Sequence, residues 1–356
     1  MNKPRFFVYV CAVAALVAQF PAASSAQFAT YKVHVTFDKP LSANVAATLP
    51  VDDGFVFTAS PAGGYKWDVL IKNLRLVSED GSVVPLQPAG RDRWSMPRGT
   101  RGQVRLNYDV DLSFTDTDKI EIGSQRGGQF FGDALYVVNR ALFVMSDAPG
   151  PKEVEFEVPA PFEIATPWEQ IAARRYRAGD NSQLVDNTTV LGQFPSFQIK
   201  EGRFNLTLAL PGSSQASRAL IEPALRSILH EYLRIFPDTP EFHVLLSYFR
   251  GPEENGEAYK DSGALTSVDP VTPRNQILWA NFLAHELFHH WNGNMIMGKD
   301  EGDYFGTSEW FAEGATEYVA NRTLVRTGII APSLFLRKME INIGMYLYWK
   351  WAAPFR

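Results

Sequence analysis

The sequence contains almost no cysteine. Its single cysteine, Cys11, lies inside an apolar run near the N-terminus. The rest of the chain therefore cannot form a disulfide, and it cannot supply the thiolates of a structural zinc site. Because Cys11 lies in the middle of the apolar run and not at its end, the pattern does not indicate a lipid-anchored cysteine.

A second long apolar run and an excess of positive charge are also missing. After residue 20 no stretch is long and apolar enough to cross a membrane, so we expect no membrane span. The formal net charge is −5, and we therefore expect no nucleic-acid partner. With 356 residues, of which 46% are hydrophobic, the chain has room for two globular domains of about 150 residues each.

The first 26 residues have the organisation of a targeting segment. Lys3 and Arg5 precede the apolar residues 6–20, and small residues follow as far as Ala26. This order is typical of a secretory signal peptide that is cut before Gln27. We therefore assign residues 1–26 to a signal peptide and expect a periplasmic or secreted bacterial protein.

Residues 27–213 have the pattern of a β-rich domain. Apolar and polar residues alternate in residues 31–37, 104–112 and 154–158, as they do in strands that bury one face. The dipeptide Asp80-Gly81 separates two short apolar runs and is typical of a hairpin turn. We predict an antiparallel β domain, built as a sandwich or as a saddle-like sheet.

Residues 214–356 combine helix and strand patterns, and we expect them to form a second, α/β domain. Residues 251–262 are predicted to be a polar loop. The expected regular elements, in chain order, are a helix over residues 218–235 whose regular part begins near Pro223, strands over residues 242–249 and 264–268, a helix that ends near Gly293, and a helix from Thr307 or Ser308 to about Gly328.

The helix that ends near Gly293 carries the most specific motif of the chain, His285-Glu286-x-x-His289. Residues four apart lie on one face of a helix, so the two imidazoles can bind one metal ion. Two imidazoles and one further ligand leave a coordination position open, as a catalytic zinc requires, and Glu286 lies close enough to activate water there. His290 is rotated by about 100° from that face and is not expected to be a ligand. The alternative is a buried helix whose histidines only pack.

A second predicted helix supplies a third ligand. Glu313 lies 24 positions after His289, which leaves enough chain to return to the first helix. Glu317 lies one helical turn further along the same face. If Glu313 binds the metal, Glu317 can accept the free N–H of a ligand histidine. The other histidines of the chain are expected to have structural roles: His34, His230 and His243.

At this point the sequence resembles a known family. His285-Glu286-x-x-His289-x-Trp291-Asn292, followed by Trp310-Phe-x-Glu313-Gly-x-Thr316-x-Tyr318, is similar to the gluzincin metallopeptidases, and most similar to the glycyl aminopeptidase family, whose bacterial members often carry a PDZ domain. Less specific sequence similarities in the β-rich half extend the resemblance, which runs from about residue 30 to residue 331.

The resemblance implies an α+β, multidomain fold, with an antiparallel β domain ahead of a thermolysin-like catalytic domain. It also implies one Zn²⁺ per chain and hydrolysis of peptide bonds in peptides or proteins by an aminopeptidase. It assigns the ligand roles to His285, His289 and Glu313, and the role of catalytic base to Glu286.

The sequence departs from the family pattern in three places. The loop after Trp291-Asn292 is short and lacks a basic, proline-containing run. No glycine-rich strand ending in a glutamate is evident to hold the amine of the substrate, and Glu254 and Glu257 are the nearest acids. The chain ends at Arg356, so we expect the C-terminal part of the catalytic domain to be missing. The oxyanion-stabilising tyrosine that the family implies is expected in that region, where Tyr346 and Tyr348 are candidates by default.

Substrate binding is expected at the strand over residues 264–268. If it is an edge strand beside the metal, Ala264, Leu265 and Thr266 could bind the substrate backbone by strand addition. Three alternatives to an aminopeptidase stay open: an endopeptidase of the same fold, a non-catalytic zinc- or peptide-binding protein, and a truncated gene product that folds poorly.

Overall fold

The computed structural model describes most of the chain after residue 27. The described residues are 28–38, 40–51, 56–59, 67–78, 80–90, 93–99, 101–113, 127–212, 215–251, 254–296 and 309–352. The predicted signal peptide with Cys11 lies outside these residues, and so do Thr307 and Ser308, where we expected a helix to begin.

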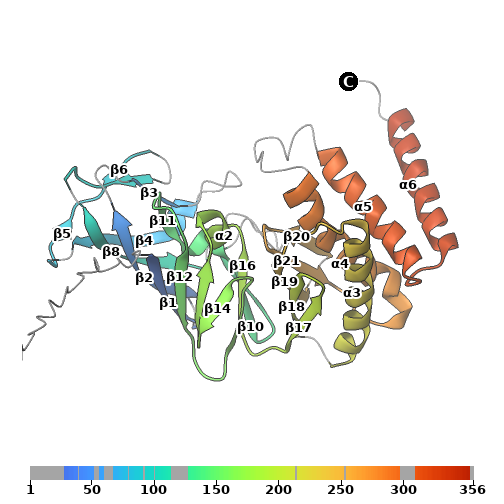
Figure 1. Ribbon diagram of the computed structural model, residues 1–356, viewed down its shortest axis with the longest axis horizontal. Helices are drawn as coiled ribbons and strands as arrows, with labels where there is room; N and C mark the ends of the chain where they lie inside the picture. The colour runs from blue at the N-terminus through green and yellow to red at the C-terminus, as the bar shows by residue number, and fades with distance from the viewer. Residues whose placement is uncertain are drawn as a thin grey trace, which may run out of the picture.

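The N-terminal half is built from strands, drawn in blue to green in Figure 1. An eight-stranded sheet has the order β14-β15-β12-β1-β2-β8-β4-β5, and two four-stranded sheets have the orders β13-β16-β10-β9 and β11-β3-β7-β6. The bounds are β1 Ala29–Thr36, β2 Ser42–Val51, β3 Val56–Ala59, β4 Ile71–Ser78, β5 Val83–Val84, β6 Gln87–Pro88, β7 Arg93–Ser95, β8 Gly102–Asp111, β9 Gly128–Phe131, β10 Ala134–Val138, β11 Val144–Ser146, β12 Lys152–Glu157, β13 Glu163–Ala165, β14 Glu169–Ala172, β15 Arg175–Ala178 and β16 Thr188–Gly192. Three short helical segments lie among them: η2 Trp67–Leu70, α1 Asn139–Leu142 and α2 Asn181–Val185.

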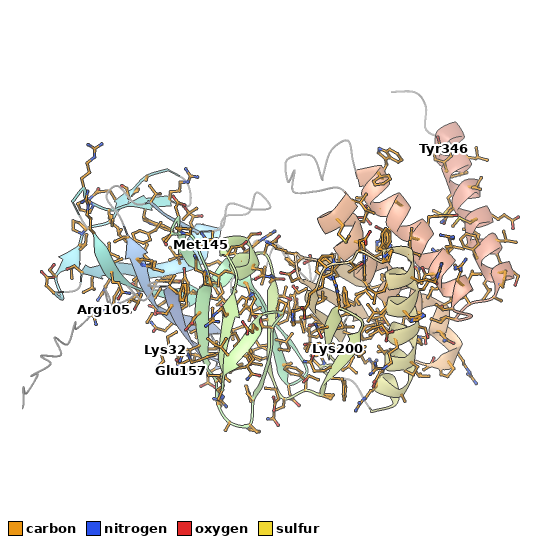
Figure 2. All side chains as sticks on the ribbon, viewed as in Figure 1. Lys32, Arg105, Met145, Glu157, Lys200 and Tyr346 are labelled. Atoms are coloured by element: carbon orange, nitrogen blue, oxygen red, sulfur yellow. The ribbon has the colours of Figure 1, made fainter. Side chains whose placement is uncertain are left out.

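The period-two sequence pattern is reproduced in the burial of these strands. In β1 every second side chain is buried, starting with Ala29. The intervening side chains face solvent, and Lys32 of β1 forms an ion pair of 2.6 Å with Glu157 of β12 on that outer face (Figure 2). Gly81 has φ +86° in the turn between β4 and β5, as the Asp80-Gly81 dipeptide predicted. The β-rich N-terminal half is therefore confirmed, although β1 and β12 pair in parallel.

The C-terminal half is organised around a five-stranded sheet with the order β17-β18-β19-β21-β20. Its three central strands are parallel, and the two edge strands are antiparallel to their neighbours. The bounds are β17 Ser196–Glu201, β18 Phe204–Ala209, β19 Phe242–Arg250, β20 Asn255–Ala258 and β21 Ser262–Ser267. The helical segments are α3 Gln215–Ile235, η3 Pro273–Asn275, α4 Gln276–Trp291, a π-helical turn at Asn292–Ile296, α5 Glu309–Arg326 and α6 Pro332–Ala352.

Both faces of this sheet are covered. Val244 and Leu246 of β19 belong to the apolar core that contains α3 and α4. Leu245 and Phe249, on the opposite face of the same strand, belong to the core of the N-terminal half. The rings of Phe249 and Phe131 lie 4.4 Å apart across this contact. The β-rich half therefore supports the sheet from one side while helices cover the other (Figure 1), which is the mixed α+β architecture that the sequence predicted.

Three details differ from the prediction. The expected domain boundary near residue 213 does not coincide with a boundary of the sheets, because β17 and β18 precede it and pair with β19. The helix α3 begins at Gln215 and contains Pro223 in its interior, where we expected its regular part to begin. The predicted polar loop over residues 251–262 contains the edge strand β20.

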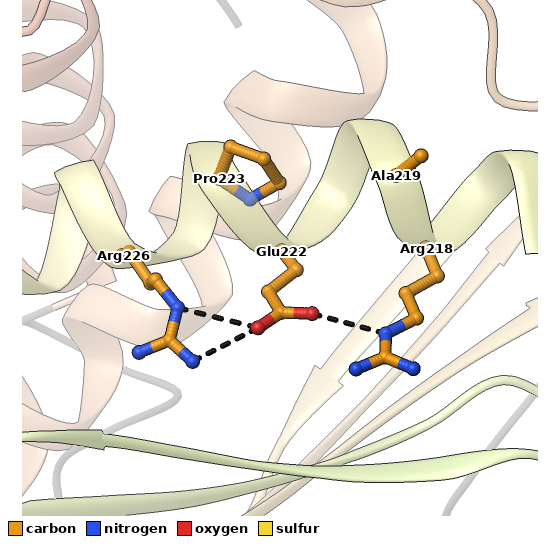
Figure 3. A pocket seen from close by; sticks show the side chains of 5 residues that line it. All are labelled: Arg218, Ala219, Glu222, Pro223 and Arg226. Carbon is orange, nitrogen blue, oxygen red and sulfur yellow. Dashed lines mark hydrogen bonds and ion pairs between the residues drawn. The ribbon is translucent and has the colours of Figure 1, made fainter.

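The outer face of α3 carries a shallow hollow beside a short ladder of charges (Figure 3). Glu222 accepts hydrogen bonds from Arg218 and from Arg226, each one helical turn away. The two arginines outnumber the glutamate, so this ladder carries one net positive charge, and the hollow shares no residue with the His285-Glu286-x-x-His289 motif on α4. Among the described residues, the helices include none with the length and apolar character of a membrane span.

Candidate metal centre

The helix α4 is fixed by its start and by its buried face. Thr272 and Asn275 form a reciprocal capping box just before it. The indole of Trp279 donates a hydrogen bond to the carbonyl oxygen of Thr272 at 2.9 Å. The core face of α4 is then fully buried, and Tyr232 of α3 donates a hydrogen bond to the carbonyl oxygen of Ala284 at 2.7 Å. The helix that carries the motif is thus held rigidly on the sheet.

His285 and His289 lie on one face of α4, as their spacing predicted. Their ring centroids are 4.8 Å apart. Glu313 approaches both rings from α5: its Oε2 lies 3.1 Å from Nε2 of His285 and 3.7 Å from Nε2 of His289. One ligand atom from each of the three residues lies within 4.8 Å of the others. The structure therefore brings together the three side chains that we proposed as ligands.

A hydrogen-bonded contact at the end of α4 sets how α5 lies against it. The side-chain amide of Asn292 donates to the carbonyl oxygen of Ala312 at 2.8 Å and to the hydroxyl of Thr316 at 3.0 Å. All of these groups are buried, and Ala312 directly precedes Glu313. Asn292 therefore helps to place Glu313 opposite the histidines. The chain continues past Gly293 in a π-helical turn, where we had expected glycine to end the helix.

Glu317 occupies the position that we predicted for it. Nδ1 of His285 donates a hydrogen bond to its Oε2 at 3.2 Å. This contact holds a proton on Nδ1, so Nε2 of His285, which faces Glu313, is the nitrogen that could give up its proton and bind a metal ion. Burial opposes protonation of His285, but the hydrogen bonds to Glu313 and Glu317 outweigh it and raise its pKa to about 9. Burial and the neighbouring charge of His285 lower the pKa of His289, which keeps that imidazole neutral.

This donor set fits a divalent metal ion. It consists of two imidazole nitrogens and one carboxylate, which is a combination that zinc accepts. The carboxylates gathered around His285 also provide the negative charge that a bound cation would balance. The site is partly open, because 46% of the Glu313 side chain is exposed while the His289 side chain is buried.

Glu286 lies beside the three proposed ligands and is nearly enclosed by protein. Only 7% of its surface is exposed. Burial raises its pKa to about 7, the negative charges of Glu313 and Glu257 add to this effect, and the charge of His285 opposes it. Gly256 of β20 packs directly against its carboxylate: a Cβ added there would lie 2.8 Å from Cδ of Glu286 and closer still to Oε1. The position of this acid therefore depends on a glycine that we did not identify from the sequence.

Comparisons with known proteins agree with this geometry. Residues 279–349 match the model of the M61 glycyl aminopeptidase family, and this range includes all three proposed ligands and Glu286.

This part of the chain is therefore similar to the M61 glycyl aminopeptidases.

A solved structure extends the similarity over most of the described chain. It is an aminopeptidase N family protein from Idiomarina loihiensis, with 18% sequence identity and a TM-score of 0.69. The match covers 87% of this chain and 56% of that protein, so this chain spans little more than half the length of that protein. At this identity the match establishes the aminopeptidase fold. No curated protein matches the sequence significantly.

The structure also corrects our expectation for substrate binding. β21, which carries Ala264, Leu265 and Thr266, lies between β19 and β20, and all three residues are buried. Their backbone groups are therefore already used within the sheet, and strand addition at β21 is excluded. The edge strand is β20, which places Gly256 beside Glu286. We missed β20 because residues 255–258 are polar and show no alternation.

The two acids that we considered for amine binding lie in different places. Glu254 accepts hydrogen bonds from Ser267 and from the backbone of Val268, so it holds the end of β21. Glu257 lies on β20, next to Gly256, and its charge acts on Glu286. Its Oε2 accepts a hydrogen bond of 2.5 Å from the hydroxyl of Tyr259. Of the two acids, Glu257 is the one that adjoins the site.

The remaining candidate residues lie outside the centre. Tyr346 and Tyr348 lie in the second half of α6, where their side chains are exposed, and Figure 2 places Tyr346 toward the outer end of that helix. His290 is buried on another face of α4, near the ring of Phe204. The exposed histidines each lie near a glutamate, at 3.2–3.6 Å: His34, His230 and His243.

Proposed function

We propose that this chain is a zinc-dependent metallopeptidase that holds one Zn²⁺ and acts as an aminopeptidase on peptides or proteins. The observation that carries the proposal is the convergence of His285, His289 and Glu313 beside the buried carboxylate of Glu286. The match of residues 279–349 supports peptidase activity, since the matched model describes a glycyl aminopeptidase.

In this proposal the three ligands hold the ion, which when bound polarises the scissile carbonyl and lowers the pKa of water. Glu286 accepts a proton from the attacking water and later donates it to the leaving amine. A pKa near 7 suits both steps, because the carboxyl can accept and release the proton at neutral pH. Glu317 keeps the proton of His285 on Nδ1.

The edge strand β20 gives the substrate a place to bind. We propose that an extended peptide lies along the outer edge of this strand by strand addition, which would bring the scissile bond close to Glu286. An aminopeptidase must also hold the ammonium group of the substrate. Glu257 lies on the same strand, and we assign that role to it.

The location of the protein is also a proposal. The N-terminal segment has the features of a signal peptide, and on this basis we place the protein in the periplasm or outside the cell.

Two measurements test the function. Peptides with free and with blocked N-termini are incubated with the zinc-loaded protein, and cleavage positions are read by mass spectrometry. Removal of single N-terminal residues from free peptides only supports an aminopeptidase. Cleavage of blocked peptides identifies an endopeptidase, and no cleavage of any peptide would refute the proposal.

The second measurement separates the roles of the site residues. Glu286→Gln keeps the shape of the side chain but cannot accept a proton, so we expect zinc to be retained and hydrolysis to be lost. His289→Ala removes a ligand, so we expect zinc itself to be lost in elemental analysis. Hydrolysis at the wild-type rate by Glu286→Gln would remove the catalytic assignment.

A further inference from the structure

The helix α6 places the side chain of Lys338 beside the metal centre. Near its start, Phe335 packs against the C-terminal core and lies 6.5 Å from the ring of Tyr318. One turn later, Nζ of Lys338 lies 2.5 Å from Oε1 of Glu317 and donates a hydrogen bond of 2.9 Å to Oδ1 of Asn281. From Ile341 to Tyr348 the large apolar side chains of α6 are exposed. Lys338 is therefore a polar contact that connects α6 to both helices carrying the proposed ligands.

The two partners of Lys338 both lie on the ligand-bearing faces. Asn281 is on α4, one turn before His285. Glu317 is on α5, one turn after Glu313. Lys338 thus bridges α4 and α5 through residues that lie one helical turn from the proposed ligands.

The carboxylate of Glu317 is held at both of its oxygens. Oε2 accepts the Nδ1 proton of His285. Oε1 faces Lys338 and also accepts a hydrogen bond of 2.8 Å from the amide of Asn321. Because the plane of a carboxylate is fixed when both oxygens are bonded, the position of Oε2, and with it the orientation of the His285 ring, depends on the partners of Oε1.

We propose that Lys338 is a positioning residue for the metal centre: it orients Glu317, through which it aligns His285, so that metal retention is coupled to the docking of α6. The proposal rests on the function proposed above, because it requires that His285 binds the metal.

The charge of Lys338 makes the proposal sharply testable. A nearby positive charge repels a bound cation, so its removal by electrostatics alone would strengthen metal binding. Loss of orientation acts in the opposite direction. Changes to residues that orient a ligand typically weaken metal binding by about 10–100-fold. Lys338 contacts Glu317 and not the proposed ligand His285 itself. We therefore expect an effect at the lower end of this range, with Lys338→Met weakening zinc binding on the order of tenfold.

The experiment measures zinc affinity by competition with a chromogenic chelator for the wild-type chain and for three variants. Lys338→Met removes the charge and the donors, Lys338→Arg keeps both, and Arg337→Met removes an exposed charge from the neighbouring position as a control. We expect a loss in Lys338→Met only. The absorption spectrum of the Co²⁺-substituted protein is expected to change in the same variant, since it reports the geometry of the ligands.

Several results would overturn the proposal. If Lys338→Met bound zinc as tightly as the wild type or more tightly, Lys338 would not be required to orient Glu317. An equal loss in Lys338→Met and Lys338→Arg would assign the effect to packing of the helix. Zinc binding by the wild-type chain without any peptide hydrolysis would refute the proposed function but would leave this test intact. Absence of zinc binding by the wild-type chain would overturn the metal centre itself.

Discussion

Replacement of Gly256 by alanine is expected to damage catalysis while the fold and the metal centre survive. A Cβ at this position would lie 2.8 Å from Cδ and 3.2 Å from Cγ of Glu286, whereas ordinary contact begins at about 3.4 Å. The carboxyl carbon must therefore move by at least about 0.6 Å, the difference between these values. Gly256 itself has an ordinary backbone conformation, so alanine adds no backbone strain.

The size of the effect follows from this displacement. Misplacement of a catalytic group by about 1 Å can cost on the order of 100-fold in rate, so a shift of this size is expected to reduce kcat/KM by about 10- to 100-fold. The atoms that must move belong to the end of a side chain and not to the backbone. The melting temperature and the zinc content should therefore stay close to the wild-type values.

The matched control is Gly314→Ala on α5. It adds the same methyl group next to the ligand Glu313, but its Cβ would meet no atom within 4 Å. We expect full activity, together with a free energy of unfolding that rises by up to about 1 kcal/mol because alanine favours the helix. Wild-type activity in Gly256→Ala, or an equal loss of activity in both variants, would contradict the role that we assign to the contact between β20 and Glu286.

Three further predictions concern stability. Asn292→Ala leaves the carbonyl of Ala312 and the hydroxyl of Thr316 buried without this partner, and should lower the free energy of unfolding in urea by about 1–3 kcal/mol. Pro223→Ala restores an amide donor within α3 and should raise that free energy by up to about 3 kcal/mol. A free energy of unfolding below that of the wild type would mean that packing of the proline ring stabilises the fold. Arg234 and Arg326 lower the pKa of the Glu231 carboxyl below its ordinary value of 4.5, so its stabilising effect is complete above about pH 4.5 and is lost as the pH falls through the lowered pKa. The difference in melting temperature between wild type and Glu231→Gln should therefore be larger at pH 7 than at pH 3, and equal differences would refute this interpretation.

The metal centre was predictable because its signals are local. His285 and His289 are four apart on one helix, and Glu313 and Glu317 repeat that spacing on another, so helical periodicity alone places each pair on one face. The structure brings all four side chains together. The approach of the two helices was less predictable, because it depends on the buried contacts of Asn292.

The surroundings of the centre were not predictable because they depend on pairing between distant segments. β20 is a short, polar edge strand, and only its pairing with β21 identifies it as a strand. Ala264, Leu265 and Thr266 were assigned to an edge for the same reason: the sequence does not reveal which strands lie on either side. Lys338 lies 21 positions after Glu317, on a helix whose apolar residues show no preferred face, so nothing in the sequence connects the two.

The proline in α3 shows how tertiary packing can override a local signal. Pro223 is typical of the first turn of a helix, and we placed the start of the regular part of a helix over residues 218–235 there. In the structure the helix begins eight residues earlier, at Gln215, and its buried residues on either side of the proline pack against the same core. Burial of this apolar face outweighs the hydrogen bond that proline cannot make.

The shared sheet has a practical consequence for anyone who wishes to dissect the protein. A fragment that starts at residue 214 would lack β17 and β18, and it would leave the backbone of β19 without a partner on one side. It would also uncover Leu245 and Phe249, which now face the N-terminal half. We expect this fragment to aggregate when it is expressed by itself, because an unpaired strand edge and an exposed apolar surface both promote self-association. The C-terminal half, which carries the proposed metal centre, should therefore be expressed together with the N-terminal half.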